Sequence, residues 1–394
     1  MGLNLFQNSW VFIQLLVGYN LVFPLLLLLL YVVFKKKLIG VVDSKGDYAI
    51  IITAFEQTHT LKAVVDSILQ LKYTNYLIYI VADNCDISEL NFNNEKVILL
   101  RPENVLASNT RSHFFAIEHF KRPHNRLTII DSDNIVTVDY LDQLNVFFNA
   151  GFSAVQGVRN PKNLNNTLAC LDAARDIYYH FYDGLLLFGV GSSATLAGSG
   201  MAFTTELYTT CLLQLSIEGA GFDKVLQNEI VKRGYRIAYA PNAEVFDEKT
   251  ANSDQLVKQR ARWINTWFRY FKFGFGMVFN GLIQFNWNKF LFGWVLLRPP
   301  LFIFLAMSIC CLTIDVFVFP ALIPYWLIAF ALFLIGFIIA LLLSKTDKRI
   351  YRSLWGIPYF IFHQLLSLLK VNKANALSIA TKHSVPTSNI GHAD

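Results

Sequence analysis

The chain has 394 residues, of which 54% are hydrophobic and only 16% are charged. Soluble globular chains carry about 25% charged residues, so much of this surface is expected to face a membrane, and a disordered chain is excluded. The 34 Lys and Arg against 28 Asp and Glu give a modest net charge of +6. These cations are not massed with aromatic side chains in one tract, which argues against a single-stranded nucleic-acid site.

Residues 1–38 are predicted to form a transmembrane signal-anchor. Residues 10–34 hold no charged side chain and exceed the roughly 20 residues that cross a bilayer. A signal peptide is the alternative, but the cations Lys35, Lys36 and Lys37 follow the apolar run instead of preceding it. Positive residues prefer the cytoplasmic side, so the following chain is expected in the cytosol. Five cysteines without a CxxC pair agree with that reducing compartment.

A transmembrane hairpin is predicted over residues 299–343. Two apolar stretches meet there near Pro320, and Asp315 is expected to mark the outer turn. Arg298 at one end and Lys345 at the other place both ends on the cytosolic side. Together with the signal-anchor, the hairpin gives about three spans.

Two further segments are predicted to lie in the membrane interface. Residues 264–298 mix many Trp and Phe with scattered cations, which is typical of an interfacial belt. Residues 344–394 are predicted to hold a second interfacial helix, over 354–370, followed by a polar cytosolic tail. A fourth span over 354–370 is the alternative.

Residues 39–263 are predicted to form a cytosolic α/β domain. Short apolar runs alternate there with amphipathic stretches, which indicates crossover connections and a mostly parallel sheet. The predicted strands are 48–55, 76–83, 96–100 and 126–133, and the helical patterns are 61–72 and 112–120. Ligands bind such sheets at the carboxyl ends of the strands. No GxGxxG follows the first strand, which argues against a dinucleotide-binding oxidoreductase.

Acidic side chains follow two of the predicted strands. Asp131 and Asp133 come directly after the strand LTII, so their carboxylates can converge on Mg²⁺ or Mn²⁺ that also bridges substrate phosphates. Asp83 follows another strand and would face the same crevice. A plain strand-end turn at the DSD triplet and an Asx turn at Asp83 are the alternatives.

A polar and aromatic cluster precedes the interfacial belt. Gln259, Arg262 and Trp263 share one helix face at i, i+3 and i+4, which offers an amide, a forked cation and an aromatic plane together. A lipid-facing anchor is the alternative. Arg260 is expected either to add charge or to face lipid headgroups.

Five motifs follow one another in a fixed order. They are Asp83, the DSD of 131–133, the GSG of 198–200, Asp223 and the QRARW that begins at Gln259. This order resembles the membrane-bound family-2 glycosyltransferases with a GT-A fold, the group that includes cellulose, chitin and hyaluronan synthases and ceramide glucosyltransferase. The resemblance covers about residues 47–270, and QxxRW after DxD is its specific part.

The resemblance implies a donor site for a UDP-sugar. Its residues would be Thr53, Ala54, Glu56, Asp83, Arg111, Asp131 and Asp133. Asp83 would meet the uridine. Asp131 and Asp133 would handle the sugar diphosphate and the metal, with Asp133 the more direct ligand. Arg111 stands where many relatives carry Lys and would also serve the diphosphate.

The resemblance also implies an acceptor site. Its residues, with those that close on the diphosphate, would be Gly198, Ser199, Gly200, Gln259, Arg262 and Trp263. Arg262 would meet the diphosphate and Trp263 would line the acceptor, with the glycine loop beneath it. Asp223 corresponds to the general base that deprotonates the acceptor hydroxyl, although Phe222 replaces the usual acidic neighbour. A helix N-cap at Asp223 and a tight turn at the glycines are the alternatives.

These features predict an inverting, metal-dependent β-glycosyltransferase, processive or short-chain, at the cytosolic face of the bacterial inner membrane. It would move a sugar from a UDP-sugar to a polysaccharide or lipid-linked acceptor, with Mg²⁺ or Mn²⁺ as cofactor. About three spans make a thin wall for an export channel, so a long polymer would require a homo-oligomer or an export partner. The alternatives are a glycolipid synthase that adds one sugar to a membrane lipid and a non-catalytic subunit of an export complex.

Overall fold

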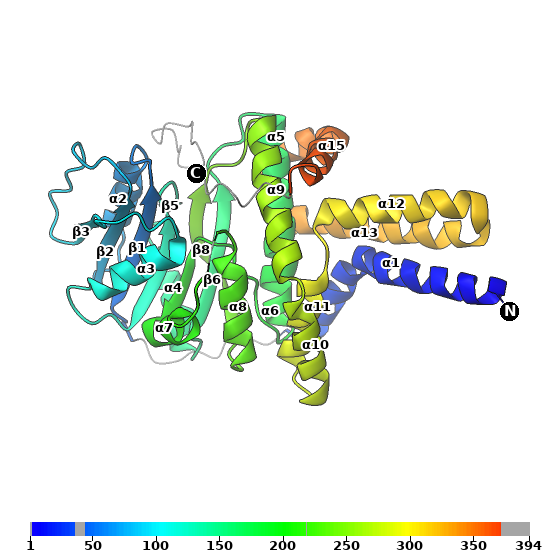
Figure 1. The fold of residues 1–394 in the computed structure, drawn as a ribbon, viewed down its shortest axis with the longest axis horizontal. Coiled ribbons are helices and arrows are strands. Elements are labelled where there is room, and N and C mark those ends of the chain that lie inside the picture. The colour runs from blue at the N-terminus through cyan, green and yellow to red at the C-terminus, as the bar shows by residue number, and fades with distance from the viewer. Residues whose placement is uncertain (1, 36–43, 218, 372–394) are drawn as a thin grey trace.

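An α/β domain and a bundle of long apolar helices make up the chain (Figure 1). The computed structural model describes residues 2–35, 44–217 and 219–371. Lys36, Lys37 and the polar tail beyond residue 371 lie outside the described residues. The bundle extends from one side of the domain, and several shorter helices run across its base (Figure 1).

The described strands form one eight-stranded sheet in the order β3-β2-β1-β4-β7-β6-β8-β5. They are β1 (Tyr48–Phe55), β2 (Tyr76–Asp83), β3 (Val97–Leu100), β4 (Arg126–Asp131), β5 (Ile135–Val136), β6 (Ala154–Pro161), β7 (Met201–Thr204) and β8 (Ile237–Asp247). Strands β1 to β4 pair in parallel, as do β6 and β8, whereas β7 and β5 pair antiparallel to their neighbours. The predicted α/β class with a mostly parallel sheet is confirmed.

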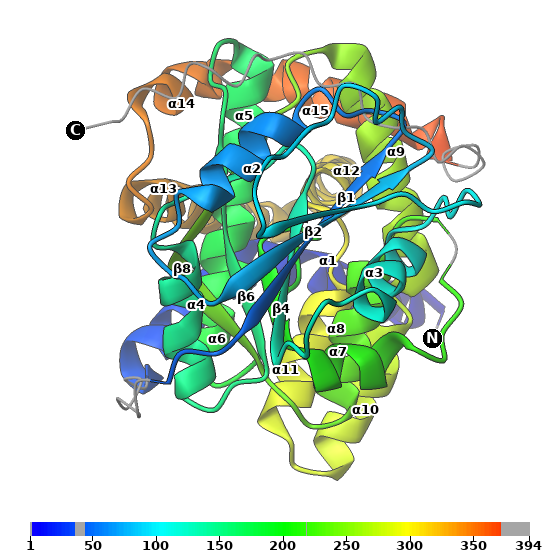
Figure 2. The ribbon, with the colours of Figure 1, turned by 90° about the vertical axis from the view of Figure 1, so that its left-hand side faces the viewer.

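Different helices bury the two faces of the sheet. Successive residues of β1 point to opposite faces, so Ile50 and Ile52 join one core cluster and Ala49 and Ile51 the other. The first cluster is closed by α2 (Leu61–Leu69) and α4 (Tyr140–Asn149), and the second by α3 (Asn109–Glu118), α5 (Thr167–Tyr179), α7 (Thr205–Leu212) and α8 (Phe222–Lys232). Figure 2 shows α2 and α4 on one side of the strands and α3, α7 and α8 on the other. Burial on both faces explains the near-continuous apolar runs in the strands.

Three described helices are long and apolar enough to cross a membrane. They are Gln7–Phe34 within α1 (Gly2–Phe34), α12 (Leu301–Val318), and Pro320–Leu343, which joins η2 (Pro320–Leu322) to α13 (Ile323–Leu343). Val17, Phe304 and Trp326, one from each of these helices, belong to the core in which they pack against one another. These stretches coincide with the predicted signal-anchor and hairpin.

Shorter helices run across the base of the bundle (Figure 1). They are α9 (Ser253–Tyr270), α10 (Phe273–Ile283), α11 (Trp287–Leu297), α14 (Lys348–Ser353), η3 (Leu354–Gly356) and α15 (Ile357–Leu368). The predicted boundary between domain and interfacial belt at residue 264 falls inside α9. The α10–α11 connection exposes Phe285 and Trp287, which suits an interfacial position. Helix α15 has 12 residues, fewer than the roughly 20 of a span, so it does not supply the alternative fourth span.

Asp315 lies in the last turn of α12, but its side chain is fully buried among the three long helices. Its carboxylate accepts hydrogen bonds from Trp10 Nε1 (2.9 Å) and Gln14 Nε2 (2.8 Å) of α1 and from Trp326 Nε1 (3.0 Å) of α13. Asp315 therefore lies at the end of the first hairpin helix, where the sequence placed the turn, and N–H donors from both neighbouring helices enclose its carboxylate.

Replacing Asp315 by Ala is expected to lower the melting temperature of the detergent-solubilised protein. The N–H groups of Trp10 and Gln14 would lose their acceptor, at a cost of about 1–3 kcal/mol for each stranded donor. Trp326 Nε1 would keep the Gln14 side-chain oxygen, at 3.0 Å, as its acceptor. The matched control is Thr313→Ala on the exposed side of the same helix, where the hydroxyl bonds only to the Ile309 carbonyl. Equal melting temperatures for the two variants would contradict this role of Asp315.

Candidate active site

Two cavities meet at the carboxyl ends of β1 and β4. The strand-end cavity, of about 280 Å³, is lined by the ends of these strands, by residues 247–250 and by α9. The helix-side cavity, of about 560 Å³, is lined by α8, α9, residues 295–302 and the end of α5 with the π-helical segment η1 (His180–Leu186) that continues it. Both cavities are lined by Asn109, Asp131, Arg159, Asp176, Gln259 and Trp263.

The DSD triplet and the GSG loop form one hydrogen-bonded unit. Asp131 ends β4 directly beside Thr53 of β1, and both line the strand-end cavity together with Asp133. The Ser199 hydroxyl is fully buried and accepts hydrogen bonds from the Asp131 backbone N–H (3.0 Å) and from Asn134 Nδ2 (2.7 Å). Ser199 therefore holds the loop of Asp131 and Asp133 in place from its buried side. Ser199 itself does not line either cavity.

The two glycines of the GSG loop have different surroundings. Gly198 lines the helix-side cavity, as the acceptor-loop prediction requires. Gly200 has φ +66°, and a Cβ there would come within 3.0 Å of Val245 Cγ2. A larger residue at 200 would thus meet both backbone strain and crowding against β8.

Asp83 is buried at the end of β2 and does not line either cavity. Its two carboxylate oxygens accept hydrogen bonds from the backbone N–H groups of Leu106 (2.9 Å) and Ala107 (2.7 Å). Ala107 has φ +45°, a left-handed conformation that is unfavourable for Ala and that these bonds hold in place. In this structure Asp83 therefore shapes the loop that leads into α3, and its contact with a nucleoside stays a prediction.

Three other predicted donor residues also lie away from the cavity walls. Ala54 is buried in the core below the end of β1. Glu56 is exposed just beyond that strand, with φ +60°, and accepts a hydrogen bond from Asn84 Nδ2 (3.4 Å). Arg111 is exposed on α3. The resemblance implied that Arg111 would serve the diphosphate together with Arg262, whereas Arg159 is the arginine that lines both cavities.

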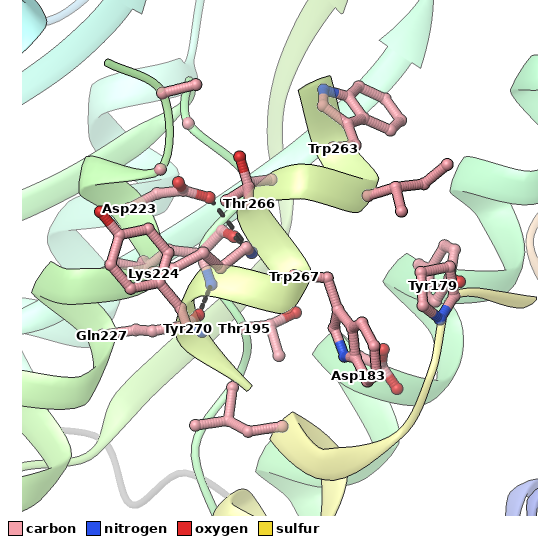
Figure 3. A pocket seen from close by; sticks show the side chains of 18 of the residues that line it. Tyr179, Asp183, Thr195, Asp223, Lys224, Gln227, Trp263, Thr266, Trp267 and Tyr270 are labelled. Carbon is pink, nitrogen blue, oxygen red and sulfur yellow. Dashed lines mark hydrogen bonds and ion pairs between the residues drawn. The ribbon is translucent and has the colours of Figure 1, made fainter. Parts of the chain in front are cut away.

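Asp223 lies in the first turn of α8 and lines the helix-side cavity. The N-cap position is occupied by Gly221, so the alternative assignment of Asp223 as an N-cap does not hold. Gly221 has φ +103°, and a Cβ there would come within 2.6 Å of Thr266 Cγ2, so the start of α8 lies close against α9. Lys224 Nζ lies 3.1 Å from the Asp223 carboxylate. Figure 3 shows both side chains beside Thr266 and Tyr270 of α9.

The QRARW motif begins in the middle of α9 and faces both cavities. Gln259 accepts a hydrogen bond from the Thr250 hydroxyl at 3.0 Å. Arg262 is half-buried on the helix-side cavity, and burial lowers the pKa of its guanidinium. Trp263 is 38% exposed where the two cavities meet.

Arg260 is 2% exposed and forms an ion pair with Asp172 of α5, so the suggestion that it faces lipid headgroups is wrong. Burial and the neighbouring Arg175 lower the pKa of Arg260 to about 10, which leaves it charged at neutral pH.

A cluster of buried ion pairs, which none of the sequence motifs indicates, accompanies Arg260. Its members are Arg159, Asp172, Arg175, Asp176, Asp247, Lys249 and Arg260. Burial alone would raise the pKa of Asp176, but Arg175 and Lys249 hold it well below its usual range. Burial lowers the pKa of His180, which lies beside this cluster, to about 4, so its ring is neutral at pH 7. Charges at i, i+3 and i+4 within the otherwise apolar α5 were the available signal in the sequence.

The far wall of the helix-side cavity reaches the long apolar helices. Arg298 is ion-paired with Asp183 of η1, and burial raises the pKa of that carboxyl. Leu301 and Phe302, the first residues of α12, also line the cavity, as does Trp267 of α9. The cavity thus joins the charged strand ends to the beginning of a helix of membrane-spanning length.

Comparison with known proteins identifies the family. The model described as "Glycosyltransferase like family 2" matches residues 46–266, more than half of the chain. Comparison with curated proteins gives no match. Among solved structures, the mannosyltransferase PcManGT from Pyrobaculum calidifontis, in complex with GDP-Man and Mn²⁺, superposes with a TM-score of 0.58 at 14% identity, covering 92% of this chain and 98% of that chain. The chain therefore belongs to the family-2 glycosyltransferases and has a GT-A-like fold with added helices that are apolar enough to span a membrane.

Proposed function

We propose that this glycosyltransferase carries out a metal-dependent, inverting transfer from a nucleoside-diphosphate sugar to an acceptor hydroxyl. The observation that carries the proposal is the meeting of the two cavities at Asp131 and Trp263. The strand-end cavity holds Asp131 and Asp133 and suits the donor. The helix-side cavity holds Asp223 and suits the acceptor. A UDP-sugar is the donor implied by the sequence resemblance, and GDP-mannose, the ligand of PcManGT, is the competing donor.

The strand-end cavity fits a hard divalent cation. Asp131 and Asp133 supply two carboxylates, and no group of three or more His, Cys, Asp or Glu suited to a metal occurs in the described ranges of the chain. A cation held by two carboxylates takes its remaining oxygens from substrate phosphates, which is the usual arrangement for Mg²⁺. When bound, Mg²⁺ or Mn²⁺ would neutralise the charge that develops on the departing diphosphate.

Protein side chains supply the other requirements of the transfer. Asp223 accepts the proton of the acceptor hydroxyl as that oxygen attacks the sugar. Arg262 and Arg159 add positive charge for the leaving diphosphate. We assign this role to Arg159 instead of Arg111 because Arg159 lines both cavities. Trp263 offers an aromatic face to the acceptor, with Gln259 beside it.

The cavity wall favours an acceptor that arrives from the membrane. One end of the helix-side cavity is charged, and the other is formed by Trp267, Leu301 and Phe302. An amphiphile could place its polar group near Asp223 and its chain along these apolar residues, so we place a lipid-linked acceptor before a free polysaccharide. The three long helices pack into a common core, and export of a polymer would therefore require a homo-oligomer or a partner. The cytosolic, inner-membrane placement rests on the flanking cations.

The proposal predicts nucleotide release that depends on metal, donor and Asp223. The purified protein is incubated with Mn²⁺ or Mg²⁺ and a panel of UDP- and GDP-sugars, and the released diphosphate is measured. One donor is expected to stand out, and Asp223→Asn is expected to reduce the rate by at least about 100-fold, the scale of a lost general base.

The matched control for this experiment is Asp254→Asn. Asp254 also lies in the first turn of a helix, but it is exposed and does not line either cavity. Its variant should retain the parent rate. Release that is metal-independent, or equal in the two variants, would reject the mechanism and favour the non-catalytic subunit.

A second prediction concerns the support of the metal ligands. Ser199→Ala removes the acceptor for the Asp131 N–H, and we expect the Mn²⁺ concentration for half-maximal activity to rise by about 10-fold or more, as for other groups that orient metal ligands. Ser193→Ala is the control, because Ser193 is equally buried and also makes two hydrogen bonds, to Asn288 and the Ile237 N–H. The same Mn²⁺ requirement in both variants would show that Ser199 does not support the metal site.

A further inference from the structure

The cluster of buried ion pairs forms the wall between the two cavities. Asp172, Asp247 and Lys249 line the strand-end cavity, and Arg175 and Arg260 line the helix-side cavity. Arg159 and Asp176 line both. We call these seven residues the shared wall.

Continuous ion pairs connect one side of the shared wall to the other. On the strand-end side, Asp247 pairs with Arg159 and, at 2.5 Å, with Lys249 Nζ. Lys249 Nζ lies 2.6 Å from the Asp176 carboxylate, which also pairs with Arg175. Lys249 has only 1% of its side chain exposed, so this cation is fixed by its two carboxylates and not by solvent.

The other side of the shared wall ends at Trp263. Asp172 forms ion pairs with both arginines, with Arg175 Nη2 at 3.1 Å and with Arg260 in a closer contact. The Arg260 guanidinium carbon lies 3.9 Å from the centre of the Trp263 ring, and that of Arg175 lies 4.3 Å from it. The ring therefore rests on two guanidinium groups that share one carboxylate.

Arg260 is too deeply buried to meet a substrate directly. It is 2% exposed, and Asp172 is as well enclosed. Trp263, in contrast, is 38% exposed at the junction of the cavities. Trp263 is therefore the exposed side chain through which Arg260 reaches the junction of the cavities.

We propose that Asp172 and Arg260 are positioning residues that hold the Trp263 ring at the junction of the two cavities, where it seats the acceptor. The position of the ring follows from the contacts described here. Its effect on the acceptor rests on the proposed function.

The first test isolates the stacking contact and does not depend on activity. Arg260→Lys keeps the charge for Asp172 but removes the planar guanidinium. The chain has seven Trp, so the emission of Trp263 is taken as the difference between each protein and the same protein with Trp263→Phe. Acrylamide quenching of this component is expected to rise by about twofold or more when the ring loses the closer of its two guanidinium contacts. Asp172→Asn, which leaves two arginines without their shared carboxylate, should act in the same direction.

The matched control is Asp347→Asn. It removes the partner of Arg349 in an exposed ion pair far along the chain, and it should leave the Trp263 component unchanged. If the Arg260→Lys and Asp172→Asn proteins melt at lower temperature but show parent-like quenching, the shared wall is only a structural element and the inference is overturned.

The second test measures the effect on the acceptor with n-octyl β-D-glucoside as the probe, in a detergent without sugar. We expect the KM for this probe to rise by about fivefold or more in Arg260→Lys, while donor hydrolysis without the probe stays within about twofold of the parent. The same substitution in a Trp263→Leu background should have no further effect, because the two residues act through one contact. An equal effect in both backgrounds would overturn the positioning role. The two parts of the proposal can fail separately. If quenching changes in the variants but the parent protein turns over no donor, the proposed function is rejected, while the contact that positions the Trp263 ring still stands.

Discussion

The buried ion pair between Asp172 and Arg260 joins α5 to α9, and the position of the Trp263 ring depends on it. Asp172 lies on α5, which leads through η1 toward the long apolar helices, and Arg260 lies on α9, which lines both cavities. Both side chains are almost excluded from solvent, and removing one partner of such a pair costs about 3–5 kcal/mol. Helix α9 is thereby fixed across the carboxyl ends of β1 and β4, with Gln259 and Trp263 at the junction of the cavities.

The chain divides the requirements of a sugar transfer between two kinds of structure. The parallel strands place Asp131 and Asp133 at one edge of the sheet, where Ser199 holds their loop from behind. Helix α8 supplies Asp223 on one wall of the helix-side cavity, and α9 and the beginning of α12 supply apolar residues on the other. The two adjoining cavities thus have a charged end, where we propose that the donor binds, and an apolar end next to helices that are long enough to cross a membrane. This arrangement is what favours a membrane-borne acceptor.

Local patterns predicted the elements well, whereas distant partners decided the roles of single residues. The run at 48–55 forms β1 with the predicted bounds because a strand buried on both faces must be apolar throughout. Asp83 also ends its strand as expected, but its oxygens bind backbone N–H groups of a later loop, which no local pattern reveals. Arg260 and Asp315 stand next to aromatic or apolar residues in the sequence, and only their tertiary partners remove them from the surface. Arg111 was proposed because it stands where many relatives carry Lys, and its place on the exposed side of α3 keeps it from the cavities.

We propose that the donor occupies the strand-end cavity, between the carboxylates of Asp131 and Asp133 and the guanidinium of Arg159. A cryo-electron microscopy structure of the protein with Mn²⁺ and UDP, and in parallel with GDP, tests it most directly. We predict a metal ion about 2.0–2.2 Å from a carboxylate oxygen of Asp131 or Asp133, and a diphosphate within hydrogen-bonding distance of Arg159 or Arg262. A nucleotide bound outside this cavity, or a metal held without either carboxylate, would contradict the claim.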